Sequence, residues 1–247
     1  GIPCFAMNTV EGGTMRTEKA RTGAFFCNRI RGKGKERWRQ VRFVLSIVIL
    51  LGPAAFVQAQ PIGEALFSTS ALSGGPFPSN LFTVPDAAQN TGLRVNLPLP
   101  DCTQRPSDCA DLTIINTLDG FNLQPRLAIP FDRPIDLMSL MGLPVFLVSL
   151  GSTRPGPSSY GTIIALNQTV WEPTTNVLYA EADGLLDQHT RYALLVTRAV
   201  RDRLGRSVKP SKNFRRFLNG DHPALVNNGA LQEYRRQIFE AIAAAQF

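Results

Sequence analysis

Residues 60–247 lack two motifs that mark common enzyme sites, and histidine is rare in the whole chain. This range has no Gly-x-Ser-x-Gly motif and no glycine-rich phosphate loop, and the only histidines are His189 and His222. The range therefore holds no nucleophile elbow of the α/β-hydrolase type and no typical nucleotide phosphate loop. His222 lies in an Asp-His-Pro turn, and both histidines are expected to be structural or solvent-facing. We expect no catalytic residue and no cofactor here.

Metal ligands are also sparse. Three pairs of aspartates offer carboxylate oxygens, but none has the ligand density of a calcium-binding loop. These pairs are Asp108 with Asp111, Asp132 with Asp136, and Asp183 with Asp187. Because no second cysteine pair or nearby histidine accompanies the cysteines either, the sequence predicts no metal site.

The chain as a whole is basic, but its net charge of +7 comes entirely from one end. Residues 1–59 carry ten Lys or Arg against three Glu, whereas residues 60–247 carry sixteen basic and sixteen acidic residues. A neutral body with a basic leader does not have the electrostatic footprint of a nucleic-acid-binding protein. We therefore expect no nucleic-acid partner.

The segment Arg37 to Gln60, RWRQVRFVLSIVILLGPAAFVQAQ, has the outline of a secretory signal peptide. A basic region precedes an apolar core of nine residues, Phe43 to Leu51, and small residues follow. Cleavage is predicted between Ala59 and Gln60, so the protein is expected to be exported. The alternative is a membrane anchor, but a spanning helix needs roughly 20 apolar residues and this run is shorter. Residues 1–59 are therefore expected to lie outside the fold, and their basic clusters are interpreted as a leader or as a binding arm.

Two of the four cysteines, Cys102 and Cys109, lie in the part expected to be exported. They flank a polar, turn-forming sequence, CTQRPSDC, and in an oxidising compartment a disulfide is the natural state of such a pair. The bond would close a small loop within residues 60–125. Because prolines are frequent there, this range is predicted to be an extended strap.

Short apolar runs bounded by turn residues follow the strap. The clearest are residues 126–131, 145–150, 162–171, 176–182 and 191–200. Because no long amphipathic helix separates them, they predict an antiparallel β-sandwich over residues 126–208 rather than a parallel α/β sheet. Within it, LLDQHTRYALLVT has the layout of a tyrosine corner, in which Leu186 precedes Tyr192 at the head of a strand. An ordinary half-buried strand tyrosine is the alternative.

Residues 209–247 are interpreted as a linker followed by a helix. Asn228 is a candidate cap, and Leu231, Tyr234, Ile238 and Ile242 recur at helical spacing. Basic residues are dense just before this helix. They are Arg198, Arg201, Arg203, Arg206, Lys209, Lys212, Arg215 and Arg216. This stretch is interpreted as a solvated edge and linker or as a surface that attracts anionic lipid or cell-surface polysaccharide.

Several segments together resemble a known family. FPSNLFTVPD (77–86), NTGLRVNLP (90–98) and NTLDGFNLQPRLAIPF (116–131) resemble the N-terminal region of bacterial virulence-factor lipases, the secreted lipase and phospholipase family. Residues 126–208 resemble bacterial Ig-like domains of the surface-layer type.

The patterns and the resemblance together predict a mainly β chain, in which an Ig-like antiparallel β-sandwich is preceded by the strap and followed by the C-terminal helix. The resemblance further implies a non-catalytic accessory module of an exported bacterial serine ester hydrolase, with a hydrolase domain after Phe247 as its partner and lipid or cell-surface material as a second partner. A free-standing exported Ig-like surface or adhesion module is the alternative.

Overall fold

The computed structural model describes residues 4–6, 60–70, 74–156 and 159–245. The chain divides into one unit of residues 1–11 and 61–247 and another of residues 12–60. The elements below all belong to the first unit. The predicted signal peptide, with Ala59 at its expected cleavage point, lies outside the described residues. Among the helices that the structure does describe, none is long and apolar enough to cross a membrane.

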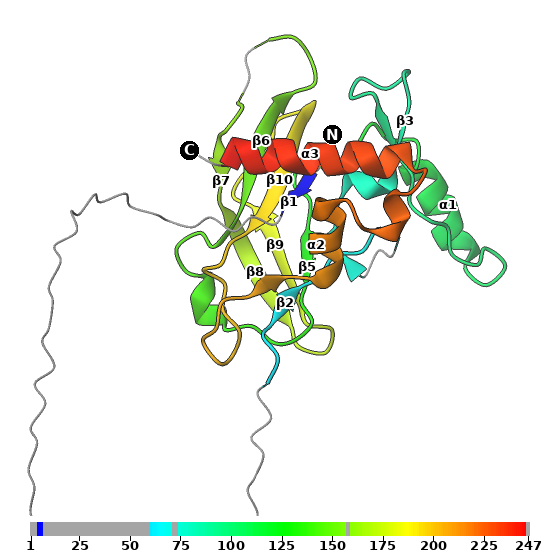
Figure 1. Cartoon of the computed structure of the whole chain (residues 1–247). Helices are drawn as coiled ribbons and strands as arrows, with labels where there is room; N and C mark the ends of the chain where they lie inside the picture. Colours follow the sequence, from blue (N-terminus) through cyan, green and yellow to red (C-terminus); the bar gives the residue numbers. More distant parts are fainter. Residues whose placement is uncertain (1–3, 7–59, 71–73, 157–158, 246–247) are drawn as a thin grey trace, which may run out of the picture. The chain divides into compact units, whose positions relative to one another are not determined.

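Apart from β1 (Cys4–Ala6), the strands of the two largest sheets of the described body come from the predicted apolar runs (Figure 1). The larger has the order β1-β10-β6-β7, with strands Cys4–Ala6 (β1), Val145–Ser152 (β6), Ile163–Ile164 (β7) and Thr190–Val196 (β10). The smaller has the order β5-β9-β8, with strands Leu127–Pro130 (β5), Leu166–Glu172 (β8) and Val177–Ala182 (β9). The prediction of a mainly β fold with a C-terminal helix is confirmed.

Burial along the strands follows from their side-chain patterns. In β9 alternate residues are buried, because this strand presents one face to the core and the other to solvent. In β6 and β10 nearly every residue is buried, as expected for continuous apolar runs that are covered on both faces. The helix α3 (Gly229–Ala245) contacts β6 and supplies part of this cover. A single cluster of buried residues joins both sheets and α3.

The run predicted as one strand over residues 162–171 is two strands in two different sheets. Strand β7 pairs with β6, whereas β8 pairs with β9. Ala165 lies between them and its carbonyl accepts a hydrogen bond from Asp183 N (2.9 Å). The chain therefore passes from one sheet to the other here without a loop, which a continuous apolar pattern does not reveal.

One part of the expected leader belongs to the folded unit. Strand β1, at residues 4–6, pairs in parallel with residues 193–195 of β10. The expectation that residues 1–59 lie outside the fold is therefore wrong for these three residues. The physical reason is that β10 has a free backbone edge on the side away from β6, and a short extended segment can pair with that edge.

The predicted strap is not extended throughout. It contributes short strands at Glu64–Ala65 (β2), Thr83–Pro85 (β3) and Leu93–Val95 (β4), but residues Pro106–Ile115 form the helix α1. Pro106 occupies the first turn of this helix, where a missing N–H costs nothing, so this proline starts a helix rather than preventing one. Figure 1 shows α1 at the right-hand edge of the body, outside the two large sheets.

The predicted linker after residue 209 is also structured. Strand β11 (Lys209–Pro210) pairs in parallel with β2, and the helix α2 (Lys212–Asn219) follows it. Ser211 caps α2, because its hydroxyl accepts a hydrogen bond from Phe214 N, and Gly220 ends it at a φ of 88°, which favours glycine. The helix α3 begins as predicted, with Asn228 Oδ1 accepting from Leu231 N (3.1 Å).

Candidate functional site

Tyr192 is buried at the head of β10 with its hydroxyl next to the chain that precedes the strand. The hydroxyl accepts a hydrogen bond from Asp187 N (2.9 Å), and Leu186 beside it is also buried. Burial is the largest influence on the Tyr192 phenol and raises its pKa, so the ring stays neutral. The residues singled out in the sequence thus form a structural contact and place no reactive group at a surface.

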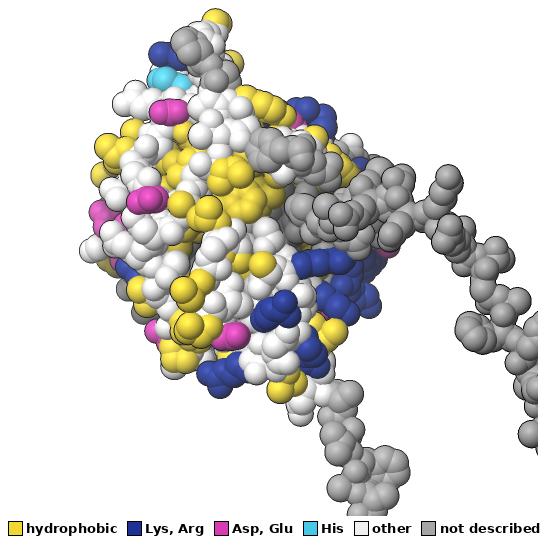
Figure 2. Space-filling model, turned by 90° about the vertical axis from the view of Figure 1, so that its left-hand side faces the viewer, with side chains coloured by type: hydrophobic (Ala, Val, Ile, Leu, Met, Phe, Trp, Pro, Cys, Tyr) yellow, Lys and Arg dark blue, Asp and Glu magenta, His cyan; other side chains and the backbone are white. Residues whose placement is uncertain are grey.

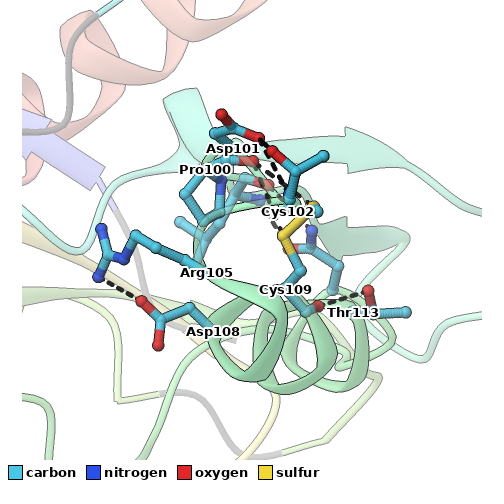
Figure 3. Close-up of a disulfide and its surroundings, with 10 residues drawn as sticks. Pro100, Asp101, Cys102, Arg105, Asp108, Cys109 and Thr113 are labelled. Carbon is cyan, nitrogen blue, oxygen red and sulfur yellow. Dashed lines mark hydrogen bonds and ion pairs between the residues drawn. A yellow bond between two sulfur atoms is a disulfide. The ribbon is translucent and has the colours of Figure 1, made fainter.

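Cys102 and Cys109 are joined by a disulfide, with their Cα atoms 5.6 Å apart (Figure 3). Cys109 is the buried residue of α1, and its carbonyl accepts from Thr113 Oγ1 (2.7 Å). Arg105 and Asp108 form an ion pair on the exposed side of the same turn. The bond attaches the first turn of α1 to the segment before it, so its role is structural.

The two histidines make local contacts that explain their presence. His222 Nδ1 accepts from Ala224 N (3.2 Å), and its ring packs against Phe217 at a centroid distance of 5.9 Å. His189 Nδ1 lies 4.0 Å from Asp119 Oδ2, and its carbonyl accepts two hydrogen bonds from Thr153. In the described part of the chain, neither ring is hydrogen-bonded to a serine, threonine or cysteine side chain, so no nucleophile and base are paired.

The aspartate pairs do not come together as a metal site. The Asp132 carboxylate accepts hydrogen bonds from Glu64 N and from the Arg133 side chain. Asp136 caps the short 3-10 helix that follows it. Among the residues that the structure describes, no group of three or more His, Cys, Asp or Glu side chains is placed to hold a metal ion.

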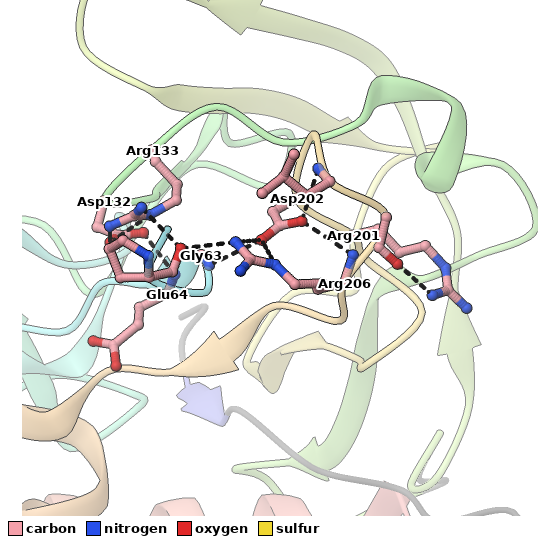
Figure 4. A network of polar contacts seen from close by, with 10 residues as sticks. Gly63, Glu64, Asp132, Arg133, Arg201, Asp202 and Arg206 are labelled. Carbon is pink, nitrogen blue, oxygen red and sulfur yellow. Dashed lines mark hydrogen bonds and ion pairs between the residues drawn. The ribbon is translucent and has the colours of Figure 1, made fainter. Parts of the chain in front are cut away.

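Some residues of the basic stretch 198–216 hold turns together through internal contacts, and three others line a cleft. Figure 4 shows the main internal network, in which Asp202 accepts from Arg206 Nη2 (2.7 Å) and from Gly63 N (3.3 Å). Arg201 donates to Gly205 O (2.7 Å), and Arg216 reaches the carbonyl of Asp221 (2.9 Å). These arginines stabilise turns and join the start of the strap to the turn after β10.

Asp202 is an ionised carboxylate at 2% exposure. Burial by itself opposes its ionisation, but hydrogen bonds from the Arg206 side chain and backbone, and from Gly63 N and Leu204 N, outweigh that cost. Together they lower the pKa of Asp202 to about 2 from an ordinary 3.8. The residue is a structural anchor, since its oxygens are occupied by the protein's own donors.

Three other cations of the stretch line a cleft of about 500 Å³ between β11 and α2. Arg198, Lys209 and Arg215 are exposed there, and Arg215 is also 3.7 Å from Glu64 Oε1. The apolar part of the lining comes from Val208, Pro210, Phe214 and Leu218, with Ser207 and Asn219 as polar neighbours. We call this the cationic cleft. It has the size of pockets that accept small molecules.

The chemistry of the cationic cleft suits an anion that carries an apolar portion. Guanidinium and ammonium groups donate to carboxylate or phosphate oxygens, whereas the apolar side chains can cover a hydrocarbon segment. The lining residues include no histidine, carboxylate or cysteine that would act as a base or a nucleophile. Figure 2 shows that Lys and Arg side chains gather on the lower part of one face of the molecule, while Asp and Glu are scattered.

The sequence indicated the charges of this cleft but not its shape. The three cations were part of the recognised basic stretch, whereas Phe214 and Leu218 belong to a helix that was interpreted as linker. The signal in the sequence that could have predicted this helix was Ser211 as its cap, an apolar residue three positions later, and Gly220 after the last turn.

Comparison of the chain with family models, with curated proteins and with solved structures gave no match.

Proposed function

We propose that this chain is the non-catalytic N-terminal accessory module of an exported bacterial serine ester hydrolase, and that residues 126–208 form an Ig-like β-sandwich. The observation that carries the proposal is the cationic cleft, whose lining combines cations with apolar side chains. The resemblance of residues 77–131 to secreted lipases supports the hydrolase as parent. The antiparallel pairings and the hydrogen bond from Asp187 N to the Tyr192 hydroxyl support the Ig-like assignment.

The cationic cleft would give such a module a role beside a hydrolase. Hydrolysis of a lipid ester releases a carboxylate that is attached to an apolar chain, and this combination of groups matches a lining with Arg198 and Lys209 as cations and the partly exposed Pro210 and Leu218 as apolar residues. Binding of this kind would hold substrate or product near a neighbouring catalytic domain, at an effective concentration set by the linkage between the two.

A binding experiment tests the cleft. Dodecanoate titrated into the 247-residue chain by calorimetry is expected to bind more tightly than neutral dodecanol. Lys209→Gln and Arg198→Gln should each weaken dodecanoate binding by up to about fivefold, the upper end of the range for one exposed ion pair. Lys212→Gln is the matched control, because Lys212 is exposed but does not line the cleft. Equal affinity for the two ligands, or equal losses in all three variants, would exclude the cleft as a carboxylate site.

The parent enzyme is tested separately. Translation of the coding DNA in frame beyond Phe247 is expected to give a Gly-x-Ser-x-Gly motif followed by an acid and a histidine, and the 247-residue chain alone is expected to release no p-nitrophenol from p-nitrophenyl esters. An immediate stop codon would instead favour the free-standing surface or adhesion module. The observation that favours this second candidate is the edge strand β8. Its residues 168–170 are exposed, and a module that binds through a strand edge needs such a strand.

A further inference from the structure

The loop that precedes β6 exposes an unusual number of large apolar side chains. Residues 137–143 have the sequence LMSLMGL. Leu137 is 49% exposed, Met138 71%, Met141 74% and Leu143 50%. The 3-10 helix within this loop, Leu137–Leu140, has no buried residue. Isolated exposed apolar residues are ordinary, but four within seven positions make this loop a candidate interaction site.

A different turn, which also exposes an apolar side chain, is hydrogen-bonded to the loop of residues 137–143. Leu204, at 62% exposure, lies in the turn of residues 201–206. Two hydrogen bonds fix this turn to the first loop, one from Asp136 N to Arg201 O (2.8 Å) and one from Arg201 N to Ser139 Oγ (3.0 Å). In Figure 1 these segments are the short green helix and the neighbouring orange loop at the lower left. We call residues 137–143 together with the 201–206 turn the apolar edge.

The charges that face solvent at the apolar edge are positive. Arg201 and Arg203 are exposed, and Arg203 has no ion pair or hydrogen bond to any of the described residues. Asp202 is buried and bonded to Arg206, so its charge is already compensated. Asp136 is half-buried and its carboxylate accepts from Met138 N (3.0 Å). The edge therefore combines exposed apolar side chains with two arginines that form no ion pair with any of the described residues.

We propose that the apolar edge docks on an anionic lipid surface, with Met138 and Met141 entering the boundary between headgroups and acyl chains. Apolar residues flanked by cations are the arrangement that binds such surfaces, because the apolar part is buried among the lipids while Lys and Arg contact their phosphates. The charge of Arg203 favours this occupant over a neutral apolar protein surface. The proposal concerns a different surface from the cationic cleft and does not depend on ligand binding there.

The test places a reporter at the edge itself. An environment-sensitive fluorophore is attached at Met141→Cys in the 247-residue chain after Cys4 and Cys27 are replaced by Ser, and vesicles of phosphatidylcholine with or without phosphatidylglycerol are added. A blue shift is expected with the anionic vesicles. The matched control is the same probe at Leu185→Cys, a leucine that is 76% exposed outside the edge, where no shift is expected. Because the readout is local, vesicle binding by the apolar segment of residues 43–51 does not produce it.

Affinity and charge give a second readout. Arg203→Gln should weaken binding to the anionic vesicles by about fivefold, as expected for one cation near a charged bilayer, whereas Lys212→Gln should leave the affinity unchanged. No shift at position 141 on vesicles that sediment with the protein, or no binding of vesicles at all, would overturn the proposal. A blue shift at position 141 without lipid, with a doubled mass in light scattering, would overturn it too and assign the edge to a second copy of the chain.

Discussion

The sheets and the disulfide-linked helix α1 are stabilised in different ways. The sheets bury apolar side chains on most of their strands, and Phe214 and Phe217 of α2 extend the same core. The helix α1 buries Cys109 alone and leaves Ile114 66% exposed. It is held by polar contacts and by the disulfide, because Asn116 exchanges two hydrogen bonds with the backbone of Leu97. One region thus depends on burial, and the other on bonds that fix a small loop.

The largest effect should follow loss of a core side chain. Phe217 is fully buried and packs between Phe67, at a centroid distance of 5.1 Å, and Tyr234, at 6.1 Å. Phe217→Ala is expected to lower the free energy of unfolding by about 3–5 kcal/mol, measured by urea denaturation. The control is Phe239→Ala, whose ring is 45% exposed, with an expected loss of about 1 kcal/mol or less. Similar losses in the two variants would contradict the core assignment.

A somewhat smaller effect is expected at Asp202, the buried carboxylate of the same body. Its pKa is about 2 when folded and 3.8 ordinarily, a difference equivalent to about 2.5 kcal/mol at neutral pH. A lowered pKa stabilises the fold above the unfolded value, and this contribution is lost as the pH falls from about 4 to about 2. Asp202→Asn should therefore destabilise the protein by about that amount at pH 7, and the difference from the unsubstituted protein should shrink over this acidic range. A constant difference would exclude the ionised carboxylate as its source.

The smallest and most local effect is expected at the disulfide. Closing so short a loop contributes about 2 kcal/mol in the chain-entropy account. Replacing Cys102 and Cys109 by Ser should therefore speed hydrogen exchange in α1 by about thirtyfold, while amides of β10 keep their rates. Exchange that rises equally in β10 would show that α1 and the sheets unfold as one unit, and the comparison between the two regions would fail.

The elements that depend on burial are those that the sequence predicted best. The runs that form β5, β6, β9 and β10 are apolar and bounded by turn residues. Burial of these apolar side chains explains both the sequence pattern and the strands. The helix α1 was missed because its apolar residues do not lie on one buried face, and because Pro106 was interpreted as part of a turn. Its cysteines were recognised because the turn-forming residues between them allow the chain to fold back before the helix begins at Pro106.

The candidate site was only half predictable for a related reason. The charges of Arg198, Lys209 and Arg215 are visible in the sequence, but a cleft forms only where β11 and α2 meet. The helix α2 spans eight residues and its burial rests on Phe214 and Phe217, which is too short a pattern to stand out from a linker. The exposure of the apolar edge could not be predicted from the sequence either. LMSLMGL has the composition of a core segment, and only the structure shows that it is exposed.

The parallel pairing of residues 4–6 with β10 covers the outer edge of that strand. While that strand is in place, the backbone donors and acceptors on the outer side of β10 are occupied. In a chain cut after Ala59 the same side would present unpaired amides and carbonyls next to a strongly apolar strand, which is the kind of edge at which proteins associate into aggregates. Residues 4–6 therefore keep this edge of the sheet closed for as long as they are part of the chain.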